Sequence, residues 1–285
     1  MITAMPRIAI ATNDFSGIVS LFRDKLGMPV ADVSEGSVAS LGAKLAMCVP
    51  EGGSNIELMS PADPAAPLSM SLQKFLDRRG EGLFALMLEA PDPDAEAELL
   101  IERGLNVLPL MAGAGGRDIH PRSTHGVLIR VYPVDSFQAQ PEQIQSDQTQ
   151  ALGLTGIDRI VIAVHDLEEA MGVYGRQLGM SIASAKINEQ QGSTSSVCSP
   201  PSGGTIELVA VRDATIPFAK SIADHLSAHG EGMYALVLRA LDSPDLVAAL
   251  GERGIDAEPC DGLAGTLEIG RGSLFGARIL IELSA

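Results

Sequence analysis

The sequence predicts an α+β protein of two tandem domains and four βαβββ units, in which each domain is a curved half-barrel sheet around a cleft. Three observations predict this fold class. The chain repeats itself at a nearly constant spacing, each unit begins with an apolar strand and a short amphipathic helix, and a Gln-rich segment separates the copies. A βαβββ unit leaves one sheet face open, so two units closing side by side would enclose an interior cleft.

Five blocks of the first half recur in the second half at spacings of 150 to 152 residues. The blocks are RIAIATNDFSGIVSLFRDKLGMPVA and RIVIAVHDLEEAMGVYGRQLGMSIA (from Arg7 and Arg159), NIELMS and TIELVA (around Glu57 and Glu207), FLDRRGEGLFALMLEA and HLSAHGEGMYALVLRA, ERG at 102–104 and 252–254, and GVLIRV and RILIEL (ending at Val131 and Leu283). The duplication predicts domains at residues 1–135 and 154–285. Residues 136–153, rich in Gln and without apolar periodicity, are predicted to be a linker.

The first unit illustrates how each element is predicted. Residues 7–12, RIAIAT, are predicted to form a strand, and Asp14 is placed to cap the helix that follows. Gly27 stands where a helix commonly ends. The helix carries apolar residues at helical spacing: Ile18, Leu21, Phe22 and Leu26.

The remaining segments of the first half follow the same order. The predicted elements are strands at 37–43, 44–50 and 55–60, a strand at 83–90, a helix within 91–104 and a last strand at 126–132. The second half repeats this order, and its first helix has Asp166 and Glu169 in a capping-box pattern.

Composition excludes several classes of protein. The 285 residues are 46% apolar and carry a formal net charge of −16, which argues against nucleic acid and against anionic membrane surfaces as partners. A local basic pocket for a small anion remains compatible with this charge. Three widely spaced cysteines give no disulfide framework, and the N-terminus shows no signal-peptide pattern, so we expect a cytoplasmic protein. The tandem copy is compatible with a monomer or a homodimer.

The segment RIVIAVHDLEEAMGVYGRQLGM resembles the vicinal oxygen chelate superfamily, which includes glyoxalases, bleomycin-resistance proteins and extradiol dioxygenases. Within it, FLDRRGEGLFALMLEA followed by ERG, GAGG and HPRSTHGVLI is similar to methylmalonyl-CoA epimerases. The resemblance covers nearly the whole chain and implies the fold strongly. It implies the activity weakly, because this scaffold hosts many chemistries.

The resemblance also implies where a divalent metal would bind. The matching positions are Arg7, Glu57, Ala85 and Arg130 in the first half, and Arg159, Glu207, Ala235 and Glu282 in the second. An arginine has no lone pair to donate to a metal, and alanine has no ligand atom. We therefore expect no metal cofactor. Glu207 and Glu282 are the weak metal candidates. The five histidines fall in predicted loops or helices: His120, His125, His165, His225 and His229.

Guanidinium groups are expected to replace the metal. Arg159 between Glu207 and Glu282 gives a formal charge of −1, and Arg7 and Arg130 around Glu57 give +1. The first cleft is thus predicted to be cationic. Arg7 and Arg130 would hold an anion there, and Glu57 would orient it or act as a base. The alternative is that these residues are ion pairs that stabilise a cleft without function.

A Gly-rich loop at 113–126, GAGGRDIHPRSTHG, is the second candidate site. Its glycines allow backbone N–H groups to approach a ligand, and its side chains are suited to a phosphate or a thioester tail. The candidate ligand-binding residues are Arg117, His120, Arg122, Ser123 and Thr124. The alternative is a plain hairpin connection.

Three functions from different classes fit these observations. The first is an isomerase or lyase acting without a metal on a small anionic carbonyl or acyl-CoA-like substrate. The second is a non-catalytic protein that binds a small molecule, similar to bleomycin-resistance proteins. The third is a metal-dependent enzyme whose ligands are assigned wrongly above.

Overall fold

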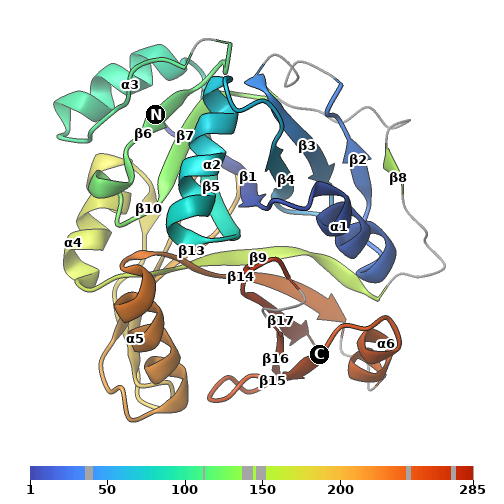
Figure 1. Cartoon of the computed structure of the whole chain (residues 1–285). Coiled ribbons are helices and arrows are strands. Elements are labelled where there is room, and N and C mark those ends of the chain that lie inside the picture. Colours follow the sequence, from blue (N-terminus) through green and yellow to red (C-terminus); the bar gives the residue numbers. More distant parts are fainter. Residues whose placement is uncertain are drawn as a thin grey trace.

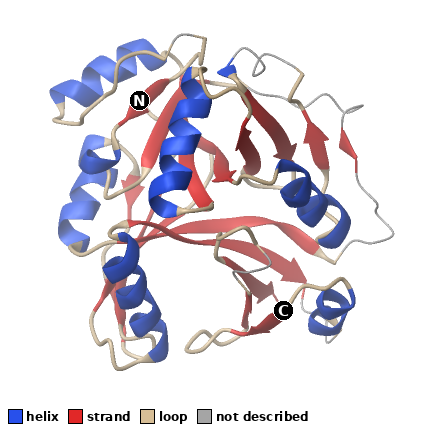
Figure 2. Cartoon of the chain, in the orientation of Figure 1, coloured by secondary structure: helices blue, strands red, loops and turns tan. Residues whose placement is uncertain are grey.

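The computed structural model describes residues 1–35, 41–111, 113–136, 144–145, 152–241, 245–270 and 274–284. Each half forms its own curved mixed sheet with helices on both faces (Figures 1 and 2). The predicted α+β class of two half-barrel domains is confirmed. None of the helices in these ranges has the length and apolar character needed to cross a membrane.

The first half contains an eight-stranded sheet in the order β6-β7-β5-β1-β4-β3-β2-β8. Its elements are β1 (Ala4–Ala11), α1 (Phe15–Ser20), the π-helical turn η1 (Leu21–Lys25), β2 (Val30–Asp32), β3 (Ala43–Cys48), β4 (Asn55–Pro61), α2 (Pro67–Arg79), β5 (Gly82–Ala90), α3 (Pro93–Glu102), β6 (Arg117–Ile119), the 3₁₀ turn η3 (Pro121–Ser123), β7 (Leu128–Pro133) and β8 (Ile144–Gln145).

The second half contains a nine-stranded sheet in the order β10-β12-β13-β9-β14-β17-β16-β15, with β11 beside β12. Its elements are β9 (Leu154–Ala163), α4 (Leu167–Met171), the π-helical turn η6 (Gly172–Gln177), β10 (Ser181–Ile182), β11 (Lys186–Asn188), β12 (Ser193–Ser199), β13 (Ile206–Val211), α5 (Pro217–His229), β14 (Gly232–Leu241), α6 (Leu246–Glu252), β15 (Ala257–Pro259), β16 (Thr266–Ile269) and β17 (Ile279–Ser284).

The two βαβββ units of each half pair with each other. β1 runs parallel to β4 and antiparallel to β5, and β9 runs parallel to β13 and antiparallel to β14. The first strands of both units therefore lie side by side at the centre of each sheet. Most of the predicted linker lies outside the described residues, and its residues 144–145 pair with β2 as β8.

Two element predictions differ from the structure. The strand predicted at 37–43 lies mostly outside the described residues, whereas β2 occupies residues 30–32. The helix α2 was not predicted, although Pro67 at its first turn, Gly80 at its end and three apolar residues at helical spacing mark it. The three apolar residues are Leu68, Leu72 and Leu76. Because α5 repeats this pattern, each half has a long helix between its two units.

Helices cover both faces of each sheet and create three apolar clusters. One large cluster contains side chains of both halves together with those of α1, α3, α4 and α6. On the opposite face, α2 packs on the first sheet and α5 on the second, each with a cluster of its own. We name this second face the cleft face, because the candidate site lies on it.

Reciprocal close contacts join the two halves. Gly126 (φ +78°) lies against the backbone carbonyl of Glu231, and Gly276 (φ +72°) lies against that of Glu81. A Cβ atom at either glycine would overlap the opposing carbonyl oxygen, and the positive φ angles themselves favour glycine. These glycines therefore set how closely the halves approach.

We predict that Gly126→Ala and Gly276→Ala each lower the free energy of unfolding by about 2–4 kcal/mol, since each variant adds both strain and overlap. Gly265→Ala is the matched control. Gly265 also has a positive φ angle (+72°), but its Cβ position faces open space, so the expected loss is only about 1 kcal/mol. Urea unfolding of the three variants measures this difference, and equal losses would contradict the interpretation.

Candidate functional site

Three predicted site residues lie on the cleft face of the first sheet. Arg7 of β1, Glu57 of β4 and Arg130 of β7 share the sheet parity of the apolar residues beneath α2. Nε of Arg7 lies 2.9 Å from Oε1 of Glu57, and the two side chains are 4% and 9% exposed. The arginine therefore has its carboxylate partner on the neighbouring strand, as a buried charge requires.

Arg130 has a partner that sequence reasoning missed. Asp118 of β6, on the neighbouring strand, accepts from Nε at 2.7 Å and from Nη2 at 3.2 Å, in a two-point arrangement. Nη2 also lies 3.5 Å from the sulfur of Met111. With Asp118, two arginines face two carboxylates, so the expected positive formal charge of the first cleft is wrong and the four groups are neutral together.

Tyr132 and Ser136 complete the polar lining. The guanidinium carbon of Arg7 lies 4.8 Å from the centre of the Tyr132 ring, within cation–π distance. Ser136 Oγ accepts from Nη1 and Nη2 of Arg7 at 3.4 and 3.3 Å. Sequence reasoning missed Tyr132, although it follows Arg130 by two residues and so faces the same side of β7.

These side chains surround a cavity of about 390 Å³. Its polar wall consists of Arg7, Glu57, Arg130 and Tyr132, and residues 113–115 of the Gly-rich loop border it. Its apolar wall comes from β3, β4, α2 and a residue shortly before β3. The apolar lining residues are Leu41, Leu45, Met59 and Leu68. The volume suits a small molecule.

Burial controls the protonation of this site. Burial raises the pKa of Glu57, and the nearby Arg7 and Arg130 offset only part of that effect. Burial likewise raises the pKa of Tyr132, against the lowering effect of Arg130. Glu57 thus holds a proton more readily than an exposed glutamate, and the Tyr132 hydroxyl remains a hydrogen-bond donor at neutral pH.

The five candidate residues of the Gly-rich loop do not gather at this cavity. Arg117 Nε donates to Asp94 Oδ1 of α3 at 2.6 Å. Ser123 and Thr124 hydroxyls bond backbone groups of the loop, including the carbonyl of His120, and so hold its shape. His120 and Arg122 instead line a separate cavity beside α2.

In the second half, Arg159 makes contact with three carboxylates. Its Nε lies 2.8 Å from Glu207 Oε2, and its Nη1 lies 2.6 Å from Glu282 Oε2. Nη1 also lies 2.5 Å from Asp158, which bonds Arg239 as well. Sequence reasoning missed Asp158 and Arg239. Arg159 is 23% exposed, so the second cluster is more open to solvent than the Arg7–Glu57 pair.

The strand register corrects one predicted equivalence between the halves. Arg130 is opposite Met87, and the residue opposite Val237, the counterpart of Met87, is Leu280. Arg130 therefore corresponds to Leu280 and not to Glu282, because the last block repeats at 150 residues instead of 152.

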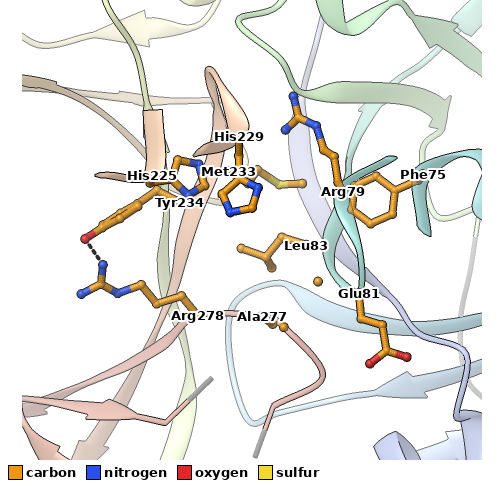
Figure 3. A pocket seen from close by; sticks show the side chains of 12 residues that line it. Phe75, Arg79, Glu81, Leu83, His225, His229, Met233, Tyr234, Ala277 and Arg278 are labelled. Atoms are coloured by element: carbon orange, nitrogen blue, oxygen red, sulfur yellow. Dashed lines mark hydrogen bonds between the residues drawn. The ribbon is translucent and has the colours of Figure 1, made fainter. Parts of the chain in front are cut away.

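By the same register, Leu128 of the first half corresponds to Arg278 of the second. Nη2 of Arg278 donates to Glu268 at 2.6 Å. Arg278 also lies beside Tyr234 (Figure 3), with its guanidinium carbon 4.4 Å from the ring centre. Sequence reasoning missed this ion pair. The spacing of 150 residues between Gly126 and Gly276 was the signal that could have found it.

The donor atoms present do not fit a divalent metal. Arg7 and Arg159 lie on the central strands where the resemblance placed ligands, and both bind carboxylates. Across the described ranges, no three His, Cys, Asp or Glu side chains are grouped as a metal site requires. The five histidines lie in loops, turns and α5.

Comparison with family models assigns the fold. A model described as the glyoxalase/bleomycin resistance protein/dioxygenase superfamily matches residues 7–120, and a model described as a glyoxalase-like domain matches residues 157–273. The chain belongs to this superfamily. It is a tandem member with one domain of the family in each half.

Solved structures agree with this assignment. A mutant of 4-hydroxymandelate synthase from Streptomyces coelicolor is 17% identical with a TM-score of 0.65, over 98% of this chain and 92% of that chain. A xylose isomerase-like TIM barrel/4-hydroxyphenylpyruvate dioxygenase fusion protein is 13% identical with a TM-score of 0.63, over 99% of this chain and 49% of that chain. At these identities the likeness shows the fold alone.

Methylmalonyl-CoA epimerase from Mycobacterium tuberculosis matches about half of the chain. It is 26% identical with a TM-score of 0.40, over 47% of this chain and 90% of the epimerase. No curated protein sequence matches the chain.

The raised pKa of Glu57 predicts a pH dependence of stability. The folded protein binds the Glu57 proton more tightly than the unfolded chain, so its stability relative to Glu57→Gln falls as the pH rises above about 4.5, the ordinary value. Urea unfolding of both proteins between about pH 4 and pH 8 measures the difference. A wild-type protein that gains stability relative to Glu57→Gln as pH rises would show instead that Arg7 dominates.

Proposed function

We propose that the first cleft is a metal-independent catalytic site of the isomerase or lyase type, acting on a small anionic carbonyl compound. The carrying observation is the buried Glu57, with a raised pKa, beside Arg7, Arg130 and Tyr132 in one cavity of about 390 Å³. A carboxyl group of raised pKa suits general base catalysis near neutral pH.

The reaction that this arrangement supports is proton abstraction beside a carbonyl group. The Glu57 carboxylate accepts the proton from the neighbouring carbon, and the C–H electron pair moves into an enolate. Return of the proton from Glu57 to a different carbon of a conjugated enolate, on the same face, completes an isomerisation. Loss of a leaving group from the next carbon instead completes an elimination.

Two hydrogen-bond donors can stabilise the negative charge that develops on the carbonyl oxygen. Asp118 occupies Nε and Nη2 of Arg130, and no side chain in the described part of the chain accepts from Nη1. The Tyr132 hydroxyl is the second donor, because the raised pKa keeps it protonated. Donors placed around a developing oxyanion are among the largest contributions to catalysis.

One observation favours a second function. Arg7 and Arg130 are each paired with a carboxylate of the protein, so the cleft carries no net formal charge. Such a cleft also suits a protein that binds a small molecule without changing it. The two functions differ in whether the bound compound exchanges its proton with solvent.

We predict that a bound carbonyl compound exchanges the hydrogen beside its carbonyl for deuterium in heavy water. A thermal-shift screen with small 2-oxo acids, dicarboxylates and short acyl thioesters selects the compounds, and NMR follows the exchange. Glu57→Gln should slow exchange by about 10²–10⁴-fold, the range for loss of a general base, while the compound still binds. Binding without exchange in the wild type would support the binding protein.

We further predict a division of labour between the clefts. Arg7→Ala should abolish binding of the selected compound, because Arg7 lines the cavity of the first cleft. Arg159→Ala should mainly lower the free energy of unfolding, because it removes the cation that pairs with Glu207 and Glu282 on the second sheet. Isothermal titration calorimetry and urea unfolding separate the effects, and equal losses of affinity would refute the assignment.

A further inference from the structure

A second cavity of about 410 Å³ lies between α2 and the loop that contains η3. It shares no lining residue with the first cleft. Lys74, Arg78 and Arg79 of α2 and Arg122 of the loop supply four cations to its rim. We name this cavity the α2 groove.

The cations of the α2 groove have no carboxylate partner within 4.0 Å among the residues that the structure describes. Arg79 donates from Nη2 to the backbone carbonyl of Glu231 at 3.3 Å. The chain has 36 acidic and 20 basic residues, so carboxylates are abundant. Like charges gathered without neutralisation repel one another, which points to an anion from outside the chain.

The second half provides an internal control for these cations. α5 is a helix of 13 residues, as is α2, and it also begins with a proline and ends at a glycine. Its residues at the matching positions are not lysine or arginine, so the helix forms without them. The replacements are Lys74 by Asp224, Arg78 by Ala228 and Arg79 by His229. Stabilisation of a helix C-terminus therefore does not account for the cluster.

The floor of the α2 groove is apolar. It contains Leu83, Leu128 and Met233 together with the rings of Phe75 and Phe84, which pack edge to face with centroids 5.2 Å apart. A ligand body that is aromatic or aliphatic gains by covering such a surface. The groove thus combines an apolar floor with a cationic rim.

His120 adds a ring N–H donor to the rim. Its Nδ1 accepts the backbone N–H of Arg122 at 3.0 Å, so in the neutral ring Nε2 carries the hydrogen. Together with the guanidinium groups, this gives several N–H donors around one cavity. Guanidinium groups match the oxygen geometry of phosphate with two parallel hydrogen bonds.

We propose that the α2 groove binds an organic phosphate, with the phosphate between Arg78, Arg122 and Lys74 and the apolar body on Phe75 and Phe84. A phosphate dianion balances the charge of four cations better than a singly charged carboxylate does. Nucleic acid is disfavoured as the source of the phosphate by the net charge of −16. Burial lowers the pKa of Arg79, and a bound dianion offsets that effect.

Isothermal titration calorimetry with phenyl phosphate tests the proposal on the full chain. The double variant Arg78→Gln/Arg122→Gln should bind at least about a hundredfold more weakly, since each lost charge-assisted contact is worth about tenfold. Arg176→Gln, at an exposed position on η6, is the matched control and should keep wild-type affinity. Circular dichroism and urea unfolding confirm that all variants fold.

Further titrations test the contributions of the phosphate and of the ring separately. Benzyl alcohol, which lacks the charge, and inorganic phosphate, which lacks the ring, should each bind more weakly than phenyl phosphate. Glu57→Gln should leave phenyl phosphate binding unchanged, so failure of the catalytic proposal does not affect this result. The proposal is overturned if the wild type fails to bind phenyl phosphate, if the double variant binds it equally well, or if either partial ligand binds as tightly.

Discussion

The requirement that a buried guanidinium group has a carboxylate partner governs the cleft faces of this protein. Arg7 and Arg130 are almost fully buried on the first sheet, and each is paired across to the next strand, with Glu57 and Asp118. Removing one partner would leave a desolvated charge, at a cost of about 3–5 kcal/mol. These pairs tie β1 to β4 and β7 to β6, and they leave the cavity lined by polar groups in fixed positions.

The two halves place the paired arginine at different positions along equivalent strands. Asp118 and Glu268 occupy equivalent positions, but the arginines that pair with them, Arg130 and Arg278, are two residues apart in register. In the first half Arg130 lines the cavity between the strands and α2. In the second half Arg278 lies over the Tyr234 ring, and its Nη1 donates to the Tyr234 hydroxyl (Figure 3). A shift of two residues on one strand thus places one arginine on the wall of the first cavity and the other against a tyrosine ring.

Much of the fold was predictable because duplication is a property of the sequence itself. Five recurring blocks sufficed for the two domains. The helix α2 was not predicted, because only its last residues, from Phe75 onward, belong to a recurring block. The predicted charge of the first cleft was wrong for a different reason. Asp118 lies 12 residues from Arg130 and reaches it only through the antiparallel register of β6 and β7. The residue pattern of one strand does not show how that strand aligns with its neighbour. The partner of a buried arginine can therefore be identified only when the neighbouring strand and its register are known.

The positive charge expected in the first half is present, but at the α2 groove instead of the cleft. Leu128 lines the groove and Arg130 lines the cleft, and the two residues face the same side of β7 about 7 Å apart along the strand. The cleft pairs its own charges and so offers an anion little long-range attraction. The groove gathers four cations in a strongly acidic protein, where they create a local positive potential that attracts a small anion. In our two proposals, attraction of an anion and transfer of a proton therefore fall to different cavities on one face of the same sheet.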